Sequence, residues 1–184
     1  MSSPYERLCE GNIRFVRGES LTRNHIARRA ELVSHQRPYA GLVTCSDSRI
    51  SPEHVFDAGL GELFIVRNAG NIVDRNALAS MEYAIQHLGV SLIVVMGHEG
   101  CGAINAACSS EEYGGNLAEL LSELGESVKR GGGDPCRVVV ENVRSSMERL
   151  RTGSELLKSA IGEGRVIVRG AVYSLESGFV RWIE

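Results

Sequence analysis

The sequence predicts an α/β protein in three layers: a central, mostly parallel four-stranded β-sheet plus a C-terminal edge strand, flanked by helices. Three observations predict this class. Short apolar, β-branched runs alternate with helical patterns, which implies parallel pairing through crossover helices. The chain has 184 residues, 43% of them hydrophobic, which is enough for one core. Polar side chains that carry chemistry follow two of the apolar runs directly, where such sheets bind ligands.

The N-terminal part is predicted to be a helical arm over about residues 1–36. In residues 4–17 the apolar side chains alternate with charges and do not form one continuous apolar face. A second, basic helix is predicted over residues 22–35. Residues 39–47 and 62–68 are short, largely apolar and β-branched. We therefore expect two strands there, buried on both faces.

The alternation continues to the C-terminus. Apolar residues recur at helical spacing over 74–88, and Gly89 follows as a stop. Residues 91–101 are predicted to be a third buried strand. The remaining predicted elements are helices at 116–130, 135–151 and 154–161, a fourth strand at 165–174 and an edge strand at 178–183. We find no internal repeat and no linker, and we expect one domain over residues 1–184.

Composition and charge argue against several classes of protein. The formal net charge is -3 and the basic residues are mostly scattered, so nucleic acid is not an expected partner. We find neither a secretory signal nor an apolar run near the ~20 residues of a membrane span. Five cysteines at irregular spacing argue against a disulfide framework and for thiols or metal ligands. We expect a cytoplasmic protein without a membrane partner.

The candidate site lies in two short stretches, "LVTCSDSRI" and "GHEGC". Cys45 ends one predicted strand, and His98 and Cys101 end another in an H-x-x-C arrangement. Two thiolates and an imidazole make a zinc site with one position left over, and soft sulfur ligands favour zinc over magnesium or calcium. Glycines beside these ligands, Gly102 among them, give the backbone the freedom that a tight turn needs.

Each of these residues alone has a simpler interpretation. A lone histidine at a strand end is more often structural, and a single cysteine is more often a small core residue. A cysteine-phosphatase loop separates its nucleophile and arginine by more residues than separate Cys45 and Arg49, so we set it aside. Asp47 and Arg49 beside the other three residues favour metal binding, with a structural ion pair as the alternative for these two.

The sequence resembles the β-class carbonic anhydrases over nearly the whole chain. The resemblance is carried by "EGNIRFVRGES", "QRPYAGLVTCSDSR", "GELFIVRNAGN", "SMEYAIQHLGV", "GHEGCGAI", "ENVRSSMERLR" and "GAVYSLESG". The C-x-D-x-R and H-x-x-C motifs are highly specific when both occur in this order. The resemblance implies that Cys45, His98 and Cys101 bind one Zn²⁺ per chain, and that Asp47 and Arg49 form a catalytic dyad beside it.

The activity that the resemblance implies is the reversible hydration of carbon dioxide to bicarbonate and a proton by zinc-bound hydroxide, the reaction of a zinc lyase. Arg49 would hold Asp47 ionised beside the water. If Arg49 releases Asp47, the carboxylate becomes the fourth zinc ligand and closes the site. Closed relatives carry a tryptophan three residues before the first zinc cysteine, where this chain has Leu42, so an open site is favoured.

The resemblance also implies a substrate pocket and an oligomer. Its pocket residues are Gln36, Phe64, Ala69, Tyr83 and Gly102. Tyr83 lies off the apolar stripe of its helix, which a second subunit would explain. We therefore expect a homodimer or a dimer of dimers, with the N-terminal helices packed on the partner subunit.

Two alternative functions stay open on the sequence. The same scaffold hydrolyses carbonyl sulfide or carbon disulfide in some relatives. A noncatalytic zinc or redox protein would use the same cysteines only for structure, with Asp47 as the fourth ligand. Glu99 departs from the serine or threonine of many relatives and adds a charge beside the metal position.

Overall fold

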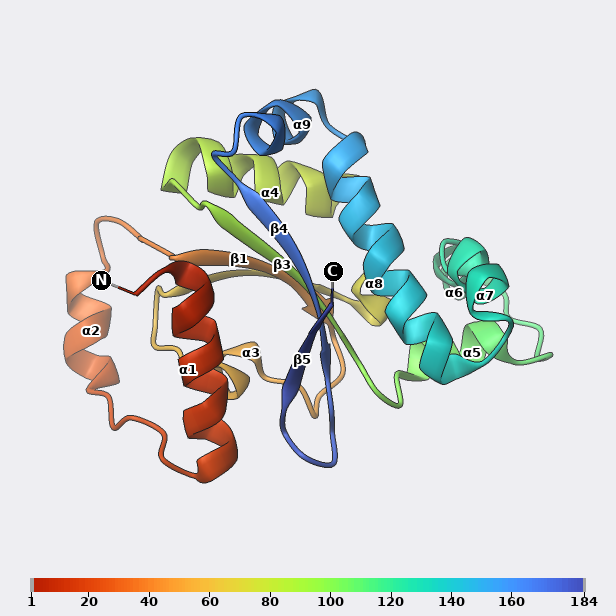
Figure 1. Cartoon of the computed structure of the whole chain (residues 1–184), viewed down its shortest axis with the longest axis horizontal. Helices are drawn as coiled ribbons and strands as arrows, with labels where there is room; N and C mark the ends of the chain where they lie inside the picture. Colours follow the sequence, from red (N-terminus) through yellow and green to blue (C-terminus); the bar gives the residue numbers. More distant parts are fainter. Residues whose placement is uncertain (1, 184) are drawn as a thin grey trace.

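The computed structural model describes residues 2–183, and these residues form the predicted α/β fold. Their sheet has five strands in the order β2-β1-β3-β4-β5 (Figure 1). The strands are β1 Ala40–Cys45, β2 Leu63–Asn68, β3 Leu92–His98, β4 Ile167–Tyr173 and β5 Val180–Ile183. The first four pair in parallel, and β5 pairs antiparallel with β4. The predicted parallel sheet with a C-terminal edge strand is confirmed.

Burial separates the inner strands from the edge. Every residue of β1 and β3 is buried. β2 is mostly half-buried, so the expectation that residues 62–68 are buried on both faces is wrong. The reason is that β2 is the last strand on its side of the sheet, and neighbouring elements cover only part of it.

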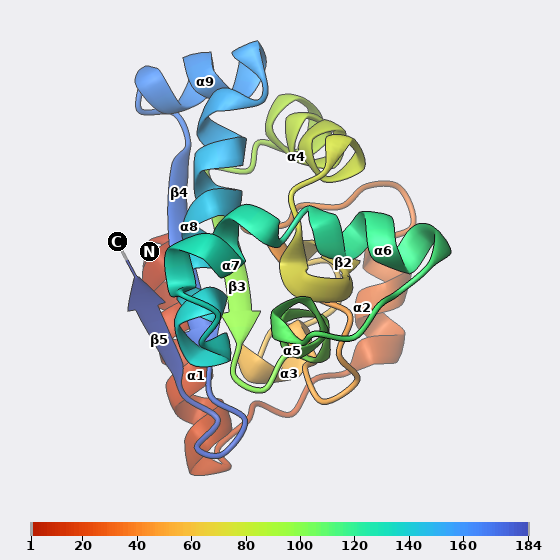
Figure 2. The same cartoon turned by 90° about the vertical axis from the view of Figure 1, so that its right-hand side faces the viewer.

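Helices cover both faces of the sheet. In chain order they are α1 Pro4–Arg17, α2 His25–Glu31, α3 Pro52–Val55, the 3-10 helix η1 Ala69–Asn71, α4 Arg75–Leu88, α5 Gly102–Cys108, α6 Gly115–Ser122, α7 Gly125–Gly131, α8 Pro135–Thr152 and α9 Glu155–Gly162. Figure 1 shows α4, α8 and α9 on one side of the sheet and α1, α2 and α3 on the other. Figure 2 shows α5, α6 and α7 grouped beside the end of β3.

The two long helices of the first group begin and end as the sequence predicts. The Asp74 carboxylate accepts the Ala77 N–H at 2.7 Å and caps α4, and Gly89 ends the helix at a φ of 70°. α8 opens with Asp134 as its cap and Pro135 in the first turn.

Two glycines in the sheet let α8 approach closely. A Cβ at Gly97 would lie 2.8 Å from Val143, and one at Gly170 would lie 2.6 Å from the sulfur of Met147. α8 therefore packs directly on β3 and β4. This contact holds the helix beside the C-terminal end of β3, where the candidate ligands lie.

The structure differs from the prediction in its short elements. Residues 116–130 form two helices, because Leu124 turns into the core between α6 and α7 and is fully buried. α2 is shorter than the predicted 22–35. The short elements α3, η1 and α5 had no prediction, since a helix of so few residues carries no periodicity.

The N-terminal arm packs partly on its own chain. A Cβ at Gly11 would lie 1.9 Å from the carbonyl oxygen of Phe56, so α1 and the end of α3 touch through their backbones. The Asn12 amide donates to the carbonyls of Val55 and Gly178. By contrast, α2 has no buried residue. Packing of the arm on a partner subunit stays a prediction. None of the described helices is both long and apolar enough to cross a membrane.

Candidate metal centre

Three candidate ligands converge at the carboxyl ends of two neighbouring strands. Cys45 ends β1 and His98 ends β3, and these strands pair in parallel. Cys101 follows on the turn that leads into α5. The sulfurs of Cys45 and Cys101 lie 3.9 Å apart, and the ligand atoms of all three residues lie within 4.8 Å of one another. All three side chains are buried.

The imidazole of His98 has one free nitrogen. Its Nδ1 lies 2.9 Å from the carbonyl oxygen of Glu99, and because a carbonyl only accepts, Nδ1 carries the proton and donates. Nε2 then bears a lone pair. It is buried and has no hydrogen-bond partner among the described residues. A buried polar atom without a partner is rare and costs free energy.

The donor set fits zinc. In a tetrahedral site with Zn–S distances of about 2.3 Å, two sulfurs lie about 3.8 Å apart. The observed separation is 3.9 Å. Two sulfurs and one neutral nitrogen match the ligand preference of zinc, and three protein ligands leave a fourth position free.

The two thiols share a hydrogen bond that moves their pKa values in opposite directions. The bond from Cys101, opposed by burial and helped by the nearby His98 and by the Gly70 N–H, lowers the pKa of the Cys45 thiol to about 4. The same bond, together with burial, raises the pKa of the Cys101 thiol above its usual range. Cys45 is therefore the sulfur that ionises first.

Asp47 and Arg49 form a tight pair beside these ligands. Oδ1 of Asp47 accepts the backbone N–H and the Nε–H of Arg49, both at 2.9 Å, and Oδ2 accepts from Nη2 at 2.7 Å. The Arg49 hydrogen bonds hold the pKa of the Asp47 carboxyl well below its usual range. Oδ2 lies 4.0 Å from Nε2 of His98. An ionised, oriented carboxylate thus borders the ligand cluster.

The turn after β2 supports Cys45 in a way that sequence reasoning missed. The N–H of Gly70 donates to the Cys45 sulfur at 3.4 Å, and Gly70 adopts a φ of 77°, which favours glycine. Asn142 of α8 is buried, and its amide donates to the Gly70 carbonyl at 2.7 Å. The only sequence signal was a glycine in the polar stretch after β2.

The predicted pocket residues separate into two groups. Ala69 and Gly102 lie beside the ligands, next to Gly70 and Cys101 in the chain. Phe64 and Tyr83 contact each other with ring centroids 6.2 Å apart, but Phe64 pairs with Gly41, four residues before Cys45. Four residues of strand span about 13 Å. These two rings therefore lie toward the opposite end of β1 from the ligands.

Gln36 belongs with the distant group. It lies in the exposed segment before β1, whereas the ligands lie after that strand. Tyr83 is 47% exposed although it is a large aromatic residue. Within one chain, Gln36 and Tyr83 do not meet the candidate ligands.

Glu99 orients His98 through its backbone. Its side chain is exposed, while its carbonyl accepts from His98 and its N–H donates to the Tyr173 carbonyl at 3.0 Å. Any residue except proline supplies the same backbone groups at this position, so the orientation of His98 does not depend on the charge of Glu99.

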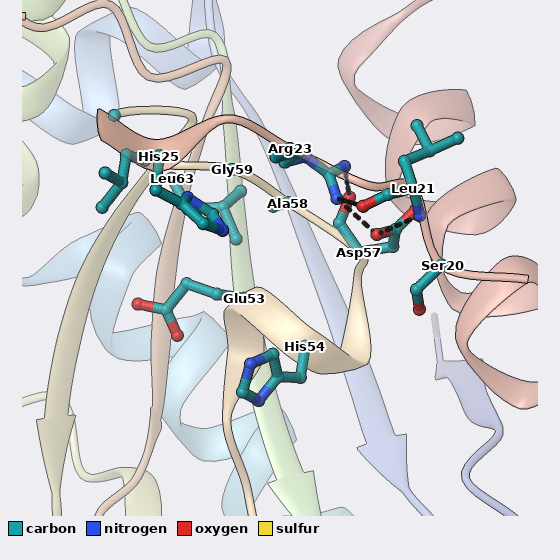
Figure 3. A pocket seen from close by; sticks show the side chains of 12 residues that line it. Ser20, Leu21, Arg23, His25, Glu53, His54, Asp57, Ala58, Gly59 and Leu63 are labelled. Atoms are coloured by element: carbon teal, nitrogen blue, oxygen red, sulfur yellow. Dashed lines mark hydrogen bonds and ion pairs between the residues drawn. The ribbon is translucent and has the colours of Figure 1, made fainter. Parts of the chain in front are cut away.

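A separate cavity lies under the N-terminal arm. Figure 3 shows this cavity of about 260 Å³, which is lined in part by His25, Glu53 and His54. At its wall the buried carboxylate of Asp57 accepts from Arg23 at 2.6 Å. None of the candidate ligands lines this cavity, and the ion pair ties the arm to the segment after α3.

Comparison with known proteins gives consistent matches. The family described as carbonic anhydrase matches residues 40–180. "Carbonic anhydrase 2" of Mycobacterium tuberculosis is 36% identical, covering 95% of this chain and 88% of that protein. The solved structure of the β-carbonic anhydrase CcaA has a TM-score of 0.80 at 27% identity, covering 99% of this chain and 96% of that one. A tetrameric β-carbonic anhydrase of Sordaria macrospora has a TM-score of 0.77 at 28% identity, covering 84% and 85%.

Proposed function

This chain belongs to the β-class carbonic anhydrases, and we propose that it is a zinc enzyme that catalyses the reversible hydration of carbon dioxide to bicarbonate and a proton. The observation that carries this proposal is the unpartnered Nε2 of buried His98 beside the sulfurs of Cys45 and Cys101. A bound metal ion would remove the cost of leaving that nitrogen without a partner, and the donor set selects zinc.

Cys45, His98 and Cys101 would hold one Zn²⁺ per chain. When bound, zinc lowers the pKa of a water molecule, so that hydroxide is available near neutral pH to attack carbon dioxide. Two thiolates cancel the formal charge of the metal and acidify the water less than neutral histidines would. A group that accepts a hydrogen bond from this water and orients it is therefore more useful here.

Asp47 is the group that fits this role. It would accept the hydrogen bond of the nucleophile at Oδ2, the oxygen 4.0 Å from His98, and orient it. Since Arg49 holds the pKa of Asp47 low, the carboxylate would stay ionised as it accepts this hydrogen bond, and the proton would go to solvent. The three N–H groups of Arg49 that bind Asp47 keep the carboxylate away from the fourth ligand position. This arrangement supports the open form of the site.

We assign the distant pocket residues to a shared site in a homodimer. The partner subunit's Phe64 and Tyr83, with its Gln36, would complete the wall beside Ala69 and Gly102. The exposure of Tyr83 and the half-buried edge strand β2 support a contact at this side of the molecule. Residues 1–184 would act as one domain in this assembly, with the arm at the interface.

The test is to measure zinc content and carbon dioxide hydration on one preparation. We expect about one zinc per chain and hydration that is lost when the metal is removed. Carbonyl sulfide hydrolysis is assayed in parallel. Rapid hydrolysis of carbonyl sulfide without carbon dioxide hydration would contradict the assignment of substrate, and zinc without either activity would indicate a structural metal.

Two variants test the dyad. Arg49→Ala should keep its zinc but lose activity at every pH, because Asp47 is then free to become the fourth ligand. Asp47→Ala should keep an open zinc site and lose the acceptor, typically a fall of about 10²–10⁴-fold. Arg165→Ala, which removes an exposed pair with Glu163, is the matched control. Wild-type turnover in Arg49→Ala would show that the pair is only structural.

A further inference from the structure

Arg67 binds the backbone of the loop that carries the dyad. From β2, its Nε donates to the carbonyl of Cys45 at 3.0 Å. Its Nη2 donates to the carbonyls of Asp47 at 2.9 Å and Ile50 at 2.8 Å. One guanidinium thus binds three carbonyls of residues 45–50, the segment that carries Cys45 and the dyad.

Among the residues that the structure describes, Arg67 has no competing ionic partner. Within residues 2–183, no carboxylate forms an ion pair with Arg67, although eleven ion pairs occur elsewhere in these residues. The hydrogen bonds found for its side chain all end on these three carbonyls. A planar fork of N–H donors is the group best shaped to bind several carbonyls at once.

The dyad loop, residues 46–50, has few other backbone anchors, although the Ile50 side chain at its end is buried in the core. The Ser46 N–H donates to the Asn68 carbonyl at 2.9 Å, and the Ile50 N–H donates to the Asp47 carbonyl at 3.0 Å. The dyad adds one bond to the neighbouring ligand loop, from Nη2 of Arg49 to the Gly100 carbonyl at 3.2 Å, but the Arg49 side chain is 56% exposed and this anchorage is weak. The distance from Asp47 to His98 therefore depends on what holds the backbone of the loop.

We propose that Arg67 is a positioning residue for the metal centre and the dyad. By fixing the carbonyls of Cys45 and Asp47, it sets the direction of the Cys45 sulfur and the 4.0 Å separation of Asp47 from His98. Arg49 binds the carboxylate of Asp47, and Arg67 binds the backbone carbonyl of the same residue. This inference rests on the proposed function, since it concerns the geometry of that site.

The size of the effect follows from how sharply such sites depend on geometry. Displacement of a reacting group by about 1 Å costs on the order of 10²-fold in rate. Loss of a residue that orients a metal ligand costs about 10–100-fold in metal affinity or activity. For Arg67→Ala we expect kcat/KM to fall about 10–100-fold and zinc release to a chelator to accelerate about tenfold.

The experiment compares Arg67→Ala, Arg67→Lys and Arg144→Ala with the wild type. Arg144 is an exposed residue of α8 that pairs only with Glu141, so it controls for loss of a surface arginine. Four quantities are measured: carbon dioxide hydration, the rate of zinc release to a chelator, the visible spectrum of the cobalt-substituted protein, and recovery of activity with added guanidinium ion.

Arg67→Lys keeps the charge and the aliphatic stem but lacks the fork, so we expect at least a tenfold loss of kcat/KM. We expect a changed cobalt spectrum and partial recovery by guanidinium in Arg67→Ala. Wild-type zinc release and spectrum in Arg67→Ala, or full activity in Arg67→Lys, would overturn the proposal. If the wild type fails to hydrate carbon dioxide, the proposed function fails, while zinc release and the cobalt spectrum still test Arg67.

Discussion

Replacement of Asn142 tests whether α8 supports the candidate metal centre through the turn after β2. Its amide donates to the Gly70 carbonyl at 2.7 Å, and the Gly70 N–H donates to the Cys45 sulfur at 3.4 Å. Asn142→Ala removes the first of these bonds. The Gly70 carbonyl is then left inside the protein without its donor.

The expected loss of stability follows from the burial of this bond. Asn142 is 3% exposed, so solvent reaches it poorly in the native state. The net contribution of one hydrogen bond to the free energy of unfolding is about 0.5–1.5 kcal/mol, and a buried carbonyl left without a donor costs about 1–3 kcal/mol. Asn142 also lines a polar cavity of about 330 Å³, from which water can partly replace the amide. We therefore expect a loss of about 2 kcal/mol in the free energy of unfolding, which lowers Tm by about 4–8 °C for a chain of this size.

The assay is urea unfolding of the zinc-loaded protein, combined with the rate of zinc release to a chelator. Zinc release should accelerate about tenfold, because the Gly70 N–H no longer faces Cys45 in a fixed direction. Asn142→Asp keeps the volume but sets a carboxylate against the carbonyl. It should cost at least as much stability as Asn142→Ala.

Asn116→Ala is the matched control, because Asn116 is exposed on α6. We expect this control to change the free energy of unfolding by less than about 0.5 kcal/mol. If Asn142→Ala behaves like the control in both measurements, or if Asn142→Asp is neutral, the reasoning about α8 is refuted.

Three further predictions follow from the same structure. Cys101→Ser should abolish both zinc retention and activity, and metal analysis that finds full zinc content would show that the ligand assignment is wrong. Asp57→Asn should destabilise the protein at neutral pH, by about 2–4 kcal/mol, because Arg14 and Arg23 lose their buried partner. Burial opposes ionisation of Asp57, but these arginines still lower its pKa. Its contribution is therefore present above the ordinary aspartate pKa of about 4 and is lost as pH falls toward the lower folded value. Urea unfolding from pH 7 to pH 3 should show the two proteins converge, and a constant difference would argue against this account. Tyr83→Arg should raise the dimer dissociation constant at least tenfold in sedimentation, with parallel loss of activity on dilution, and a fully active monomer would defeat the shared pocket.

The elements with long periodic patterns were predictable from the sequence. The helices over 74–88 and 135–151 match the structure closely, because a period of 3.6 is a local property. The four parallel strands form as predicted, but β3 ends at His98 and not at residue 101, because a turn follows it. The splitting of residues 116–130 was not predictable. It depends on Leu124 entering the core, which only the packing of α6 and α7 against their neighbours determines.

The candidate ligands were also accessible from the sequence. Cys45 and His98 end apolar strands and Cys101 follows the second of them, and the carboxyl ends of neighbouring parallel strands meet at one edge of a sheet. Asp47 and Arg49 come shortly after Cys45 in the chain, so the same edge of the sheet brings them beside these ligands. The sequence by itself therefore determined the fold class, the donor set and the neighbourhood of the dyad.

Tertiary structure alone decided how these groups are supported. Asn142 and Gly70 are separated by 72 residues, and Arg67 reaches carbonyls whose direction depends on backbone angles. Such hydrogen bonds leave no periodic trace in the sequence, because they join distant segments through backbone atoms that every residue shares. The strand register likewise decided that Phe64 lies away from the ligands of its own chain. Phe64 pairs with Gly41, near the start of β1, whereas Cys45 ends that strand, and the rise per residue separates the two positions.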